Sequence, residues 1–250
     1  MKSQGSTVPS RPAREEYEAW AKRTLNEQEP NIAQLAYDTS TTALRSYVSE
    51  LDAWTESLEH IQKLMSSRHG QQPSTMHVKP FGSVFDKLYR ENILWNKNWP
   101  EERTGGWLRL EDMYDKSGDL VRTTLVCNYL DEAIALADQL TTKLTAKKRE
   151  VVTNLGYHAL HVNWSVPIPK SIVQNLQLKP KRNAVVVEIQ VKTLIQSTVG
   201  DLIHKVYATE RSRLDRRSFA YDYKNAEFQL VYMSNAAHLI DGLAAKLRNR

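Results

Sequence analysis

Two carboxylate side chains occur in or next to apolar, strand-like sequence, where charged residues are unusual. Glu188 interrupts the apolar run 185–191, and Asp119 comes directly before the apolar run 120–127. Strand side chains alternate between faces, so Glu188 lies on one face of its strand and the core-forming residues lie on the other. The first set is Val186, Glu188, Gln190 and Lys192, and the second is Val187, Ile189 and Val191. A carboxylate in such a run is costly unless it is solvated, paired or bound to a metal. Glu188 is therefore a candidate active-site residue.

Asp119 has two interpretations. A carboxylate at a strand edge can hold Mg²⁺, and Arg122, three residues later, can reach phosphate oxygens. The alternative is an ordinary turn aspartate followed by a surface arginine.

Another polar group repeats at four-residue steps, at Lys79, Ser83 and Lys87. On a helix and its lead-in these residues share one side, so two ammonium groups and a hydroxyl converge as a clamp for a polyphosphate would require. Lysines on a helix surface are commonplace, and the pattern alone does not identify a site.

The elements that must position these residues follow from hydrophobic periodicity and from glycine and proline positions. We expect a flexible tail at 1–12 and an irregular, tryptophan-bearing excursion near the surface at 92–118. Its tryptophans pack the loop down or, alternatively, stack on a base. Helices are predicted at Glu15–Asn26, Ile32–Ser66, Val84–Arg90, Asp131–Leu144, Thr193–Arg213 and Asn225–Arg248, and strands at Leu120–Cys127, Arg149–Thr153, Tyr157–Val166 and Ala184–Val191.

This order predicts an α+β fold. One helix crosses between strands and hairpin-connected strands follow, which describes a mixed sheet flanked by helices. We expect helical N- and C-terminal extensions, with boundaries at 1–70, 71–215 and 216–250. The long N-terminal helix at Ile32–Ser66 and the helix at Asn225–Arg248 could each supply an interface for a homo-oligomer.

Composition narrows the class of protein. The 250 residues are 41% hydrophobic and 25% charged, which is typical of a folded chain. No apolar run approaches the roughly 20 residues that span a bilayer, and the polar start predicts a cytoplasmic protein without a membrane partner. The single cysteine, Cys127, excludes an internal disulfide and is expected to be a small buried hydrophobe.

The net charge of +5 and a pI near 9.1 suit a polyanionic partner such as a nucleotide or RNA. Basic residues are densest at 143–149, at 179–182 and at Arg211, Arg213, Arg216 and Arg217. Any one of these clusters can also be a solvated face.

Two strands together resemble a known family. The elements Gly156-Tyr157, Leu160-His161 and Glu188-Ile189-Gln190-Val191-Lys192-Thr193 are similar to the paired strands of the RelA/SpoT nucleotidyltransferase, or alarmone synthetase, domain. That family reads Gly-Tyr-x-x-x-His and then Glu-Ile-Gln-x-Arg/Lys-Thr. Its Arg-x-Lys-x-x-x-Ser-x-x-x-Lys element is matched at Lys79, Ser83 and Lys87, with His77 in place of the arginine. Its metal-binding strand is matched by Asp119 and Arg122. The resemblance covers roughly 76–213.

The resemblance implies a nucleotidyltransferase-like sheet and transfer of the β,γ-pyrophosphate of ATP to a ribose 3′-hydroxyl, with release of AMP. The catalytic residues it implies are Asp119, as a ligand of Mg²⁺, and Glu188, which shares the metal or accepts the hydroxyl proton. The ATP-binding residues would be His77, Lys79, Ser83, Lys87 and Arg122. Tyr157 would stack on the acceptor base, while His161 and Gln190 would orient the acceptor ribose or its phosphates.

The chain also departs from the family pattern. The metal strand usually reads Asp-x-x-Gly-x-Arg, whereas Asp119-Leu120-Val121-Arg122 is shorter, and His77 is expected to alter adenine binding. No His-Asp dipeptide occurs, which argues against the family's hydrolase domain. The chain is therefore expected to be a stand-alone, divergent small alarmone synthetase, including the toxic type that acts with an antitoxin protein.

The acceptor stays open. It is the 3′ end of tRNA, which the basic pI and the arginines at 211–217 favour, or GDP or GTP, which the family's usual activity favours. A degenerate synthetase that only binds a nucleotide or a partner is the remaining alternative. Retention of both carboxylates argues against it.

Overall fold

The computed structural model describes residues 10–25, 30–56, 76–153, 156–210 and 222–249. Several expectations lie wholly or partly outside these residues: most of the tail at 1–12, the continuation of the long helix through 57–66, and the arginines at 211, 213, 216 and 217.

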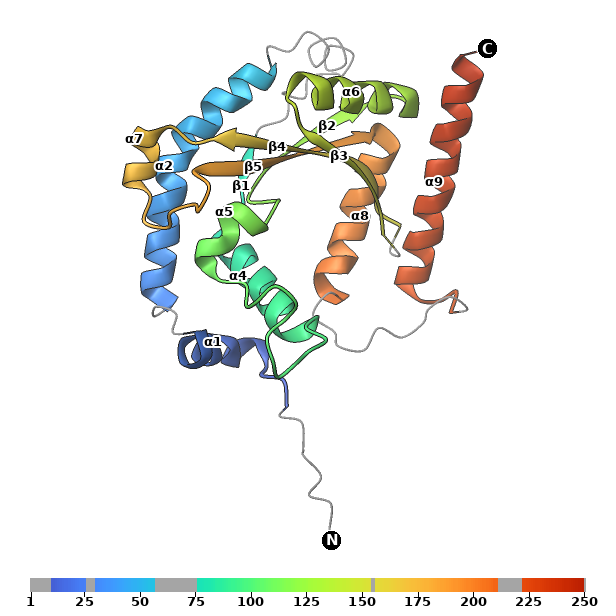
Figure 1. Ribbon diagram of the computed structural model, residues 1–250. Coiled ribbons are helices and arrows are strands. Elements are labelled where there is room, and N and C mark those ends of the chain that lie inside the picture. Colours follow the sequence, from blue (N-terminus) through green and yellow to red (C-terminus); the bar gives the residue numbers. More distant parts are fainter. Residues whose placement is uncertain (1–9, 26–29, 57–75, 154–155, 211–221, 250) are drawn as a thin grey trace.

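A five-stranded mixed sheet forms the centre of the fold (Figure 1). Its order is β1-β2-β5-β4-β3, in which β2 and β5 are parallel and the other neighbours are antiparallel. The strands are β1 (His77–Val78), β2 (Val121–Cys127), β3 (Lys147–Val152), β4 (His158–Pro167) and β5 (Ala184–Thr193). The prediction of a mixed sheet flanked by helices is confirmed.

Helices lie on both sides of the sheet. In Figure 1, α6 (Leu130–Lys143) is drawn above it, and α4 (Phe81–Tyr89), α5 (Met113–Lys116) and α8 (Leu194–Glu210) below. The helix α6 carries four buried apolar residues on one stripe, as an amphipathic helix on a sheet requires: Ala133, Leu136, Ala137 and Leu140. The remaining helices are α1 (Tyr17–Leu25), α2 (Pro30–Glu56), α7 (Lys170–Asn175) and α9 (Ala226–Arg248).

The alternation predicted for β5 is present. Val187 and Ile189 are fully buried and Val191 is 1% exposed, so this side of the strand belongs to the core. Glu188 and Lys192, on the other side, are also buried, at 7% and 8% exposed. Both faces of β5 are therefore covered, which makes the environment of Glu188 drier than a half-solvated strand would provide.

The tryptophan-bearing segment is buried at its two ends and is exposed or half-buried over most of its middle. Short helical turns occur at Arg90–Leu94 and Leu110–Asp112. Trp20 of α1 contacts the rings of Trp99 and Trp107, with centroids 5.8 and 5.0 Å away. The buried side chain of Asn92 donates to the carbonyl of Leu108 and accepts from its amide, which closes the segment into a loop. Packing thus accounts for Trp99 and Trp107, while residues 97–98, 100–102 and 104–105 are exposed, as expected of an excursion near the surface.

Other elements shift by a few residues from their predicted bounds. The hydrogen-bonded pairing at β1 and the short α7 were not predicted, because neither has enough residues for a periodic pattern. Cys127 is buried, as expected. Within the described residues, no helix combines the length and apolar character that a membrane crossing needs.

The last helix is held against the sheet by a close approach. Gly156 has φ +79°, and a Cβ there would lie 2.9 Å from Ser234 Cβ and 3.1 Å from the backbone of Val231. Ser234 also donates a hydrogen bond to the Gly156 carbonyl. Only glycine permits this contact between α9 and the lead-in to β4.

Candidate active site

Asp119 is surrounded by donors. Lys79 Nζ contacts its Oδ2, Lys87 Nζ lies 2.7 Å from its Oδ1, and the Ser117 hydroxyl donates to Oδ1 over 2.5 Å. Burial disfavours the charge of Asp119, but Lys87 and Lys79 outweigh it and hold the pKa of this carboxyl well below its usual range. Asp119 is therefore ionised at neutral pH.

The two lysines come from different elements and bind different oxygens of Asp119. Lys79 directly follows β1, which pairs with β2. Its backbone amide extends this pairing by a 2.8 Å hydrogen bond to the carbonyl of Leu120. Lys87 is near the end of α4 and also donates to the Ser117 carbonyl over 2.6 Å. The predicted convergence of two ammonium groups is present, and its target in this structure is Asp119.

Glu188 is the centre of a second hydrogen-bonded group. His161 Nδ1 lies 3.0 Å from its Oε2, and Gln190 Nε2 donates to its Oε1 over 2.7 Å. Burial again opposes the charge, but these two partners outweigh it and keep the pKa of Glu188 below its ordinary value. A carboxylate facing His161 requires the proton of that ring to sit on Nδ1.

Tyr157 completes this group. Its hydroxyl lies 3.1 Å from His161 Nε2 and 3.2 Å from Gln190 Oε1. Lys192 Nζ is 4.7 Å from the centroid of the Tyr157 ring, within the range of a cation–π contact. Burial lowers the pKa of Lys192 to about 8, although Asp201 and Glu188 favour its charge.

Strand register places Arg122 and His77 on the face of the sheet that carries Glu188. Arg122 is opposite Glu188 in the parallel pair, and His77 is opposite Arg122. On the other side of β5, Asn163 is opposite Glu188 and His161 is opposite Gln190. Asp119 and Glu188 influence each other, because the charge of Asp119 tends to raise the pKa of Glu188.

The predicted residues differ in how closely they are joined. Lys79, Lys87 and Asp119 form one contacting set, and Tyr157, His161, Glu188 and Gln190 form another. Arg122 and His77 are exposed neighbours on the same face. Ser83 is half-buried one turn before Lys87 and is not among the side chains that bind Asp119.

Sequence reasoning missed three residues. Ser117 binds both Asp119 and Lys87, but a single serine in a turn gives no periodic signal. Lys192 was placed on the correct face without a role. Asn163 is beside Glu188, and its buried Oδ1 has no hydrogen-bond partner in the part of the chain that the structure describes. The alternation along β4 could have placed it on this face.

The donor set fits Mg²⁺ of the kind shared with a nucleotide. Asp119 and Glu188 offer hard carboxylate oxygens, and Mg²⁺ is usually held by one or two carboxylates and by substrate phosphates. Among the described residues there is no group of three or more histidine, cysteine or acidic side chains that could hold a metal by itself. A site completed by phosphate is therefore the arrangement that these residues suit.

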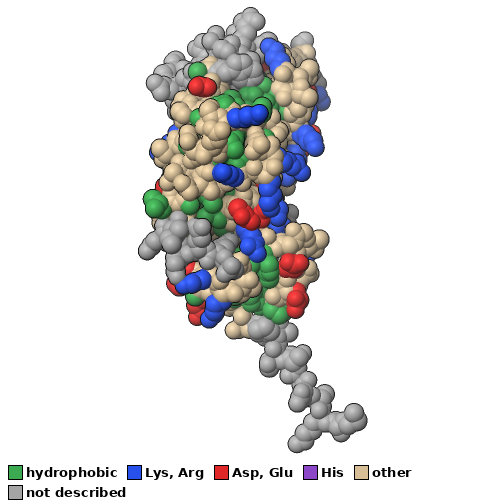
Figure 2. Space-filling view, turned by 60° about the vertical axis from the view of Figure 1, so that its left-hand side comes forward, with side chains coloured by type: hydrophobic (Ala, Val, Ile, Leu, Met, Phe, Trp, Pro, Cys, Tyr) green, Lys and Arg blue, Asp and Glu red, His purple; other side chains and the backbone are tan. Residues whose placement is uncertain are grey.

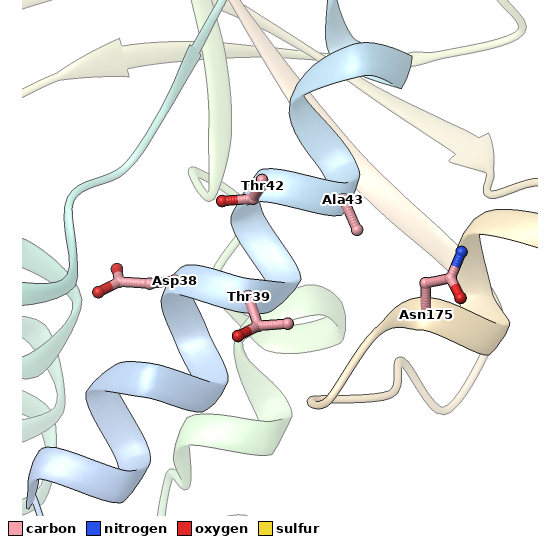
Figure 3. Close-up of a pocket in the computed structure, with 5 residues that line it drawn as sticks. All are labelled: Asp38, Thr39, Thr42, Ala43 and Asn175. Atoms are coloured by element: carbon pink, nitrogen blue, oxygen red, sulfur yellow. The ribbon is translucent and has the colours of Figure 1, made fainter.

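A separate hollow of about 470 Å³ lies between α2 and α7 (Figure 3). It is lined by Asp38, Thr39, Thr42, Ala43 and Asn175. None of these belongs to the two carboxylate groups, so this hollow has no part in the candidate site.

Comparison with known proteins gives a likeness in structure. No family model and no curated protein matches the sequence. The chain is similar to the small alarmone synthetase 1 from Bacillus subtilis, with 20% identity, a TM-score of 0.57, and coverage of 85% of this chain and 96% of that one. A GTP pyrophosphokinase family protein from Streptococcus pneumoniae gives 18% identity and a TM-score of 0.54, over 85% and 90%. The small alarmone synthetase 2 from Bacillus subtilis gives 17% and 0.51, over 84% and 97%.

These similarities extend over nearly the whole length of the matched proteins. At such identities they establish the fold, and the fold is that of the small alarmone synthetases.

Proposed function

We propose that this protein is a pyrophosphotransferase that moves the β,γ-pyrophosphate of ATP to a ribose 3′-hydroxyl and releases AMP. The observation that carries the proposal is the nearness of two carboxylates: Asp119, bound by two lysines, and the buried Glu188, held by His161 and Gln190. The fold supports it, since structures of the synthetase 1 from Bacillus subtilis are bound to its product pppGpp and to AMPCPP.

On the donor side, Lys79 and Lys87 would bind the phosphates of ATP. Phosphoryl-type transfer gains most from neutralising phosphate charge and aligning the reacting groups, and two ammonium groups about one carboxylate supply such a field. Arg122 would assist from the strand face, with Ser83 and His77 at the edge of the donor site. Bound Mg²⁺, held by Asp119 and Glu188, would neutralise charge on the transferred group.

On the acceptor side, Glu188 would accept the proton of the 3′-hydroxyl. Its lowered pKa suits a hydrogen-bonded, ionised acceptor rather than an acid. His161 and Gln190 hold its two oxygens in place and would orient the ribose. Tyr157 would stack on the acceptor base, and Lys192 beside its ring would attract acceptor phosphates.

We propose a guanosine nucleotide as the acceptor. The support is the pppGpp product of the matched synthetase. A second candidate is the 3′ end of tRNA, which one observation favours: Arg149 and Lys147 of the exposed edge strand β3 pair with His161 and Asn163, so positive charge continues from the acceptor side to the sheet edge. Lysine and arginine side chains also line one edge of the face in Figure 2. A polyanion needs such contacts beyond the reacting nucleotide.

The experiment combines purified protein, Mg²⁺ and γ-labelled ATP with GDP, GTP or deacylated tRNA in separate reactions. Label on GDP or GTP supports the proposed acceptor, and label on tRNA alone selects the second candidate. If the protein binds ATP but labels none of the three acceptors, it is a nucleotide-binding module and not a pyrophosphotransferase. Glu188→Gln and Asp119→Asn should each abolish transfer while the fold is retained.

A further inference from the structure

Two buried polar side chains of α2 form hydrogen bonds outside the helix. Tyr37 is 3% exposed and Ser40 is fully buried. They are three residues apart and lie on one face of the helix, together with the core residues Leu44 and Val48. α2 lies against α4 and α7 (Figure 1), although it belongs to the N-terminal extension expected at 1–70. Buried polar groups need partners, and the partners of these two connect α2 to the candidate site.

Tyr37 holds the backbone of Lys79. Its hydroxyl donates a hydrogen bond to the Lys79 carbonyl, and its ring contacts that of Phe81, with centroids 5.5 Å apart. Burial raises the pKa of the Tyr37 hydroxyl well above its ordinary value, so the hydroxyl keeps its proton and stays a donor. The Lys79 amide is bonded to the Leu120 carbonyl over 2.8 Å. Both polar backbone groups of Lys79 are therefore held, one by the residue before β2 and the other by α2.

The sheet alone would hold Lys79 weakly. β1 has two residues and two register pairs with β2, and Lys79 lies in the short turn between β1 and α4. The ammonium group at the end of its side chain binds Asp119, and only 13% of that side chain is exposed. Lysine has a flexible four-carbon stem, so the position of its ammonium group depends on how firmly its backbone is placed. Tyr37 supplies this constraint from outside the sheet.

Ser40 connects the same helix to the carboxylate side of the contact. It accepts a hydrogen bond from the Leu178 amide over 2.9 Å and shares a side-chain hydrogen bond with Tyr114. Tyr114 belongs to α5, which ends directly before Ser117, and Ser117 binds Asp119. α2 therefore supports both partners of the contact between Lys79 and Asp119.

We propose that Tyr37 is a positioning residue of the donor site, which fixes the backbone of Lys79 so that its ammonium group meets the phosphates of ATP. The inference rests on the proposed function, because that function gives Lys79 its phosphate-binding role. Tyr37 is not a catalytic residue, since its hydroxyl contacts the Lys79 backbone and not the ammonium group. The inference also makes α2 a working part of the donor site.

Two matched variants test the role of the hydroxyl. Tyr37→Phe and Tyr47→Phe each remove one hydroxyl of α2 that donates to a backbone carbonyl, since Tyr47 bonds to the carbonyl of Pro167 over 2.7 Å. Pro167 ends β4 and is not part of the candidate site. The Kd of AMPCPP, measured by calorimetry, should rise about tenfold in Tyr37→Phe, the equivalent of one hydrogen bond, and stay unchanged in Tyr47→Phe. An unchanged Kd in Tyr37→Phe, or an equal rise in both variants, would overturn the proposal. Thermal unfolding checks that both are folded.

A double-mutant cycle shows whether Tyr37 acts through Lys79. Lys79→Met removes the ammonium group, so Tyr37→Phe should weaken AMPCPP binding no further in that variant. A second tenfold loss in the double variant would mean that the hydroxyl supports binding by another route, contrary to the proposal. In the transfer assay, Tyr37→Phe should raise the KM for ATP and leave the KM for GTP unchanged, which a general loss of stability would not do.

The inference and the proposed function can fail separately. If the wild-type protein binds AMPCPP and transfers label, but Tyr37→Phe binds AMPCPP equally well, only the inference is wrong. If the wild-type protein does not bind AMPCPP, the proposed function fails and a titration with Mn²⁺ alone tests the contact. A loosened Lys79 competes less well for Asp119, so Tyr37→Phe should then bind Mn²⁺ about threefold more tightly than wild type, and Tyr47→Phe should not. Equal Mn²⁺ binding by all three proteins would overturn the inference.

Discussion

Replacement of Lys87 by methionine should make Asp119 a better metal ligand in the absence of nucleotide. Asp119 is held by Lys79, Lys87 and Ser117, so a metal ion must displace at least one donor to reach its oxygens. ATP phosphates that attract the lysines would release the carboxylate. The prediction is that Lys87→Met imitates this release.

The magnitude follows from the contact. The hydrogen bond from Lys87 to Asp119 is 2.7 Å long. The side chain of Lys87 is 19% exposed and that of Asp119 is 23% exposed, so water partly screens the interaction. Hydrogen bonds to charged groups contribute roughly 1.5–3 kcal/mol, and partial exposure favours the lower end. Since 1.4 kcal/mol is a factor of about ten, Lys87→Met should bind Mn²⁺ about tenfold more tightly. The same variant should lose about 1–2 kcal/mol of unfolding free energy and bind AMPCPP more weakly.

The assay is a titration of Mn²⁺ followed by electron paramagnetic resonance, with and without AMPCPP. Wild-type protein should bind Mn²⁺ weakly alone and strongly with AMPCPP. Lys97→Met, at an exposed lysine, is the matched control and should behave as wild type. Unchanged or weaker Mn²⁺ binding by folded Lys87→Met would refute the reasoning that the lysine competes for Asp119.

Three further predictions concern pH and packing. Burial lowers the pKa of Lys192 to about 8, so its ammonium group loses its charge above that pH. The KM for the acceptor should therefore rise above pH 8, and in Lys192→Arg the KM should begin to rise only at a higher pH. The pH profile of the KM checks both. Because folding lowers the pKa of Asp119, the ionised carboxylate stabilises the protein fully above about pH 4, and this stabilisation is lost as the pH falls. In Asp119→Asn the free energy of unfolding should therefore decrease less at acid pH, as denaturant titrations at several pH values will measure. Gly156→Ala should destabilise the protein by about 2–4 kcal/mol, because of its positive φ and the 2.9 Å approach to Ser234, whereas Gly200→Ala in α8 meets no atom within 4 Å and should be neutral or stabilising. Thermal unfolding of the two glycine variants compares them directly.

Local periodicity explains which parts of the fold could be predicted from sequence. The alternation at Val187, Ile189 and Val191 is a property of one strand, and the structure confirms it. The pairing of Lys79 with Asp119 joins residues 40 positions apart and depends on the register of β1 with β2, which no local pattern contains. The spacing of Lys79 and Lys87 predicted that they converge, but not that a carboxylate lies between them.

Other features required tertiary contacts. Ser117 acts through a turn, and Trp99 and Trp107 pack against Trp20, which α1 supplies. Propensity marks such a segment as irregular and does not reveal what covers it. The roles of Asp119 and Glu188 stay predictions that only chemistry can test.

The most direct test of the pyrophosphotransferase account measures AMP and labelled acceptor in the same reaction. With γ-labelled ATP, Mg²⁺ and GTP, we expect one AMP for each labelled, 3′-pyrophosphorylated guanosine nucleotide, and neither product from Glu188→Gln. Formation of ADP or free phosphate without AMP, or equal transfer by Glu188→Gln, would contradict it.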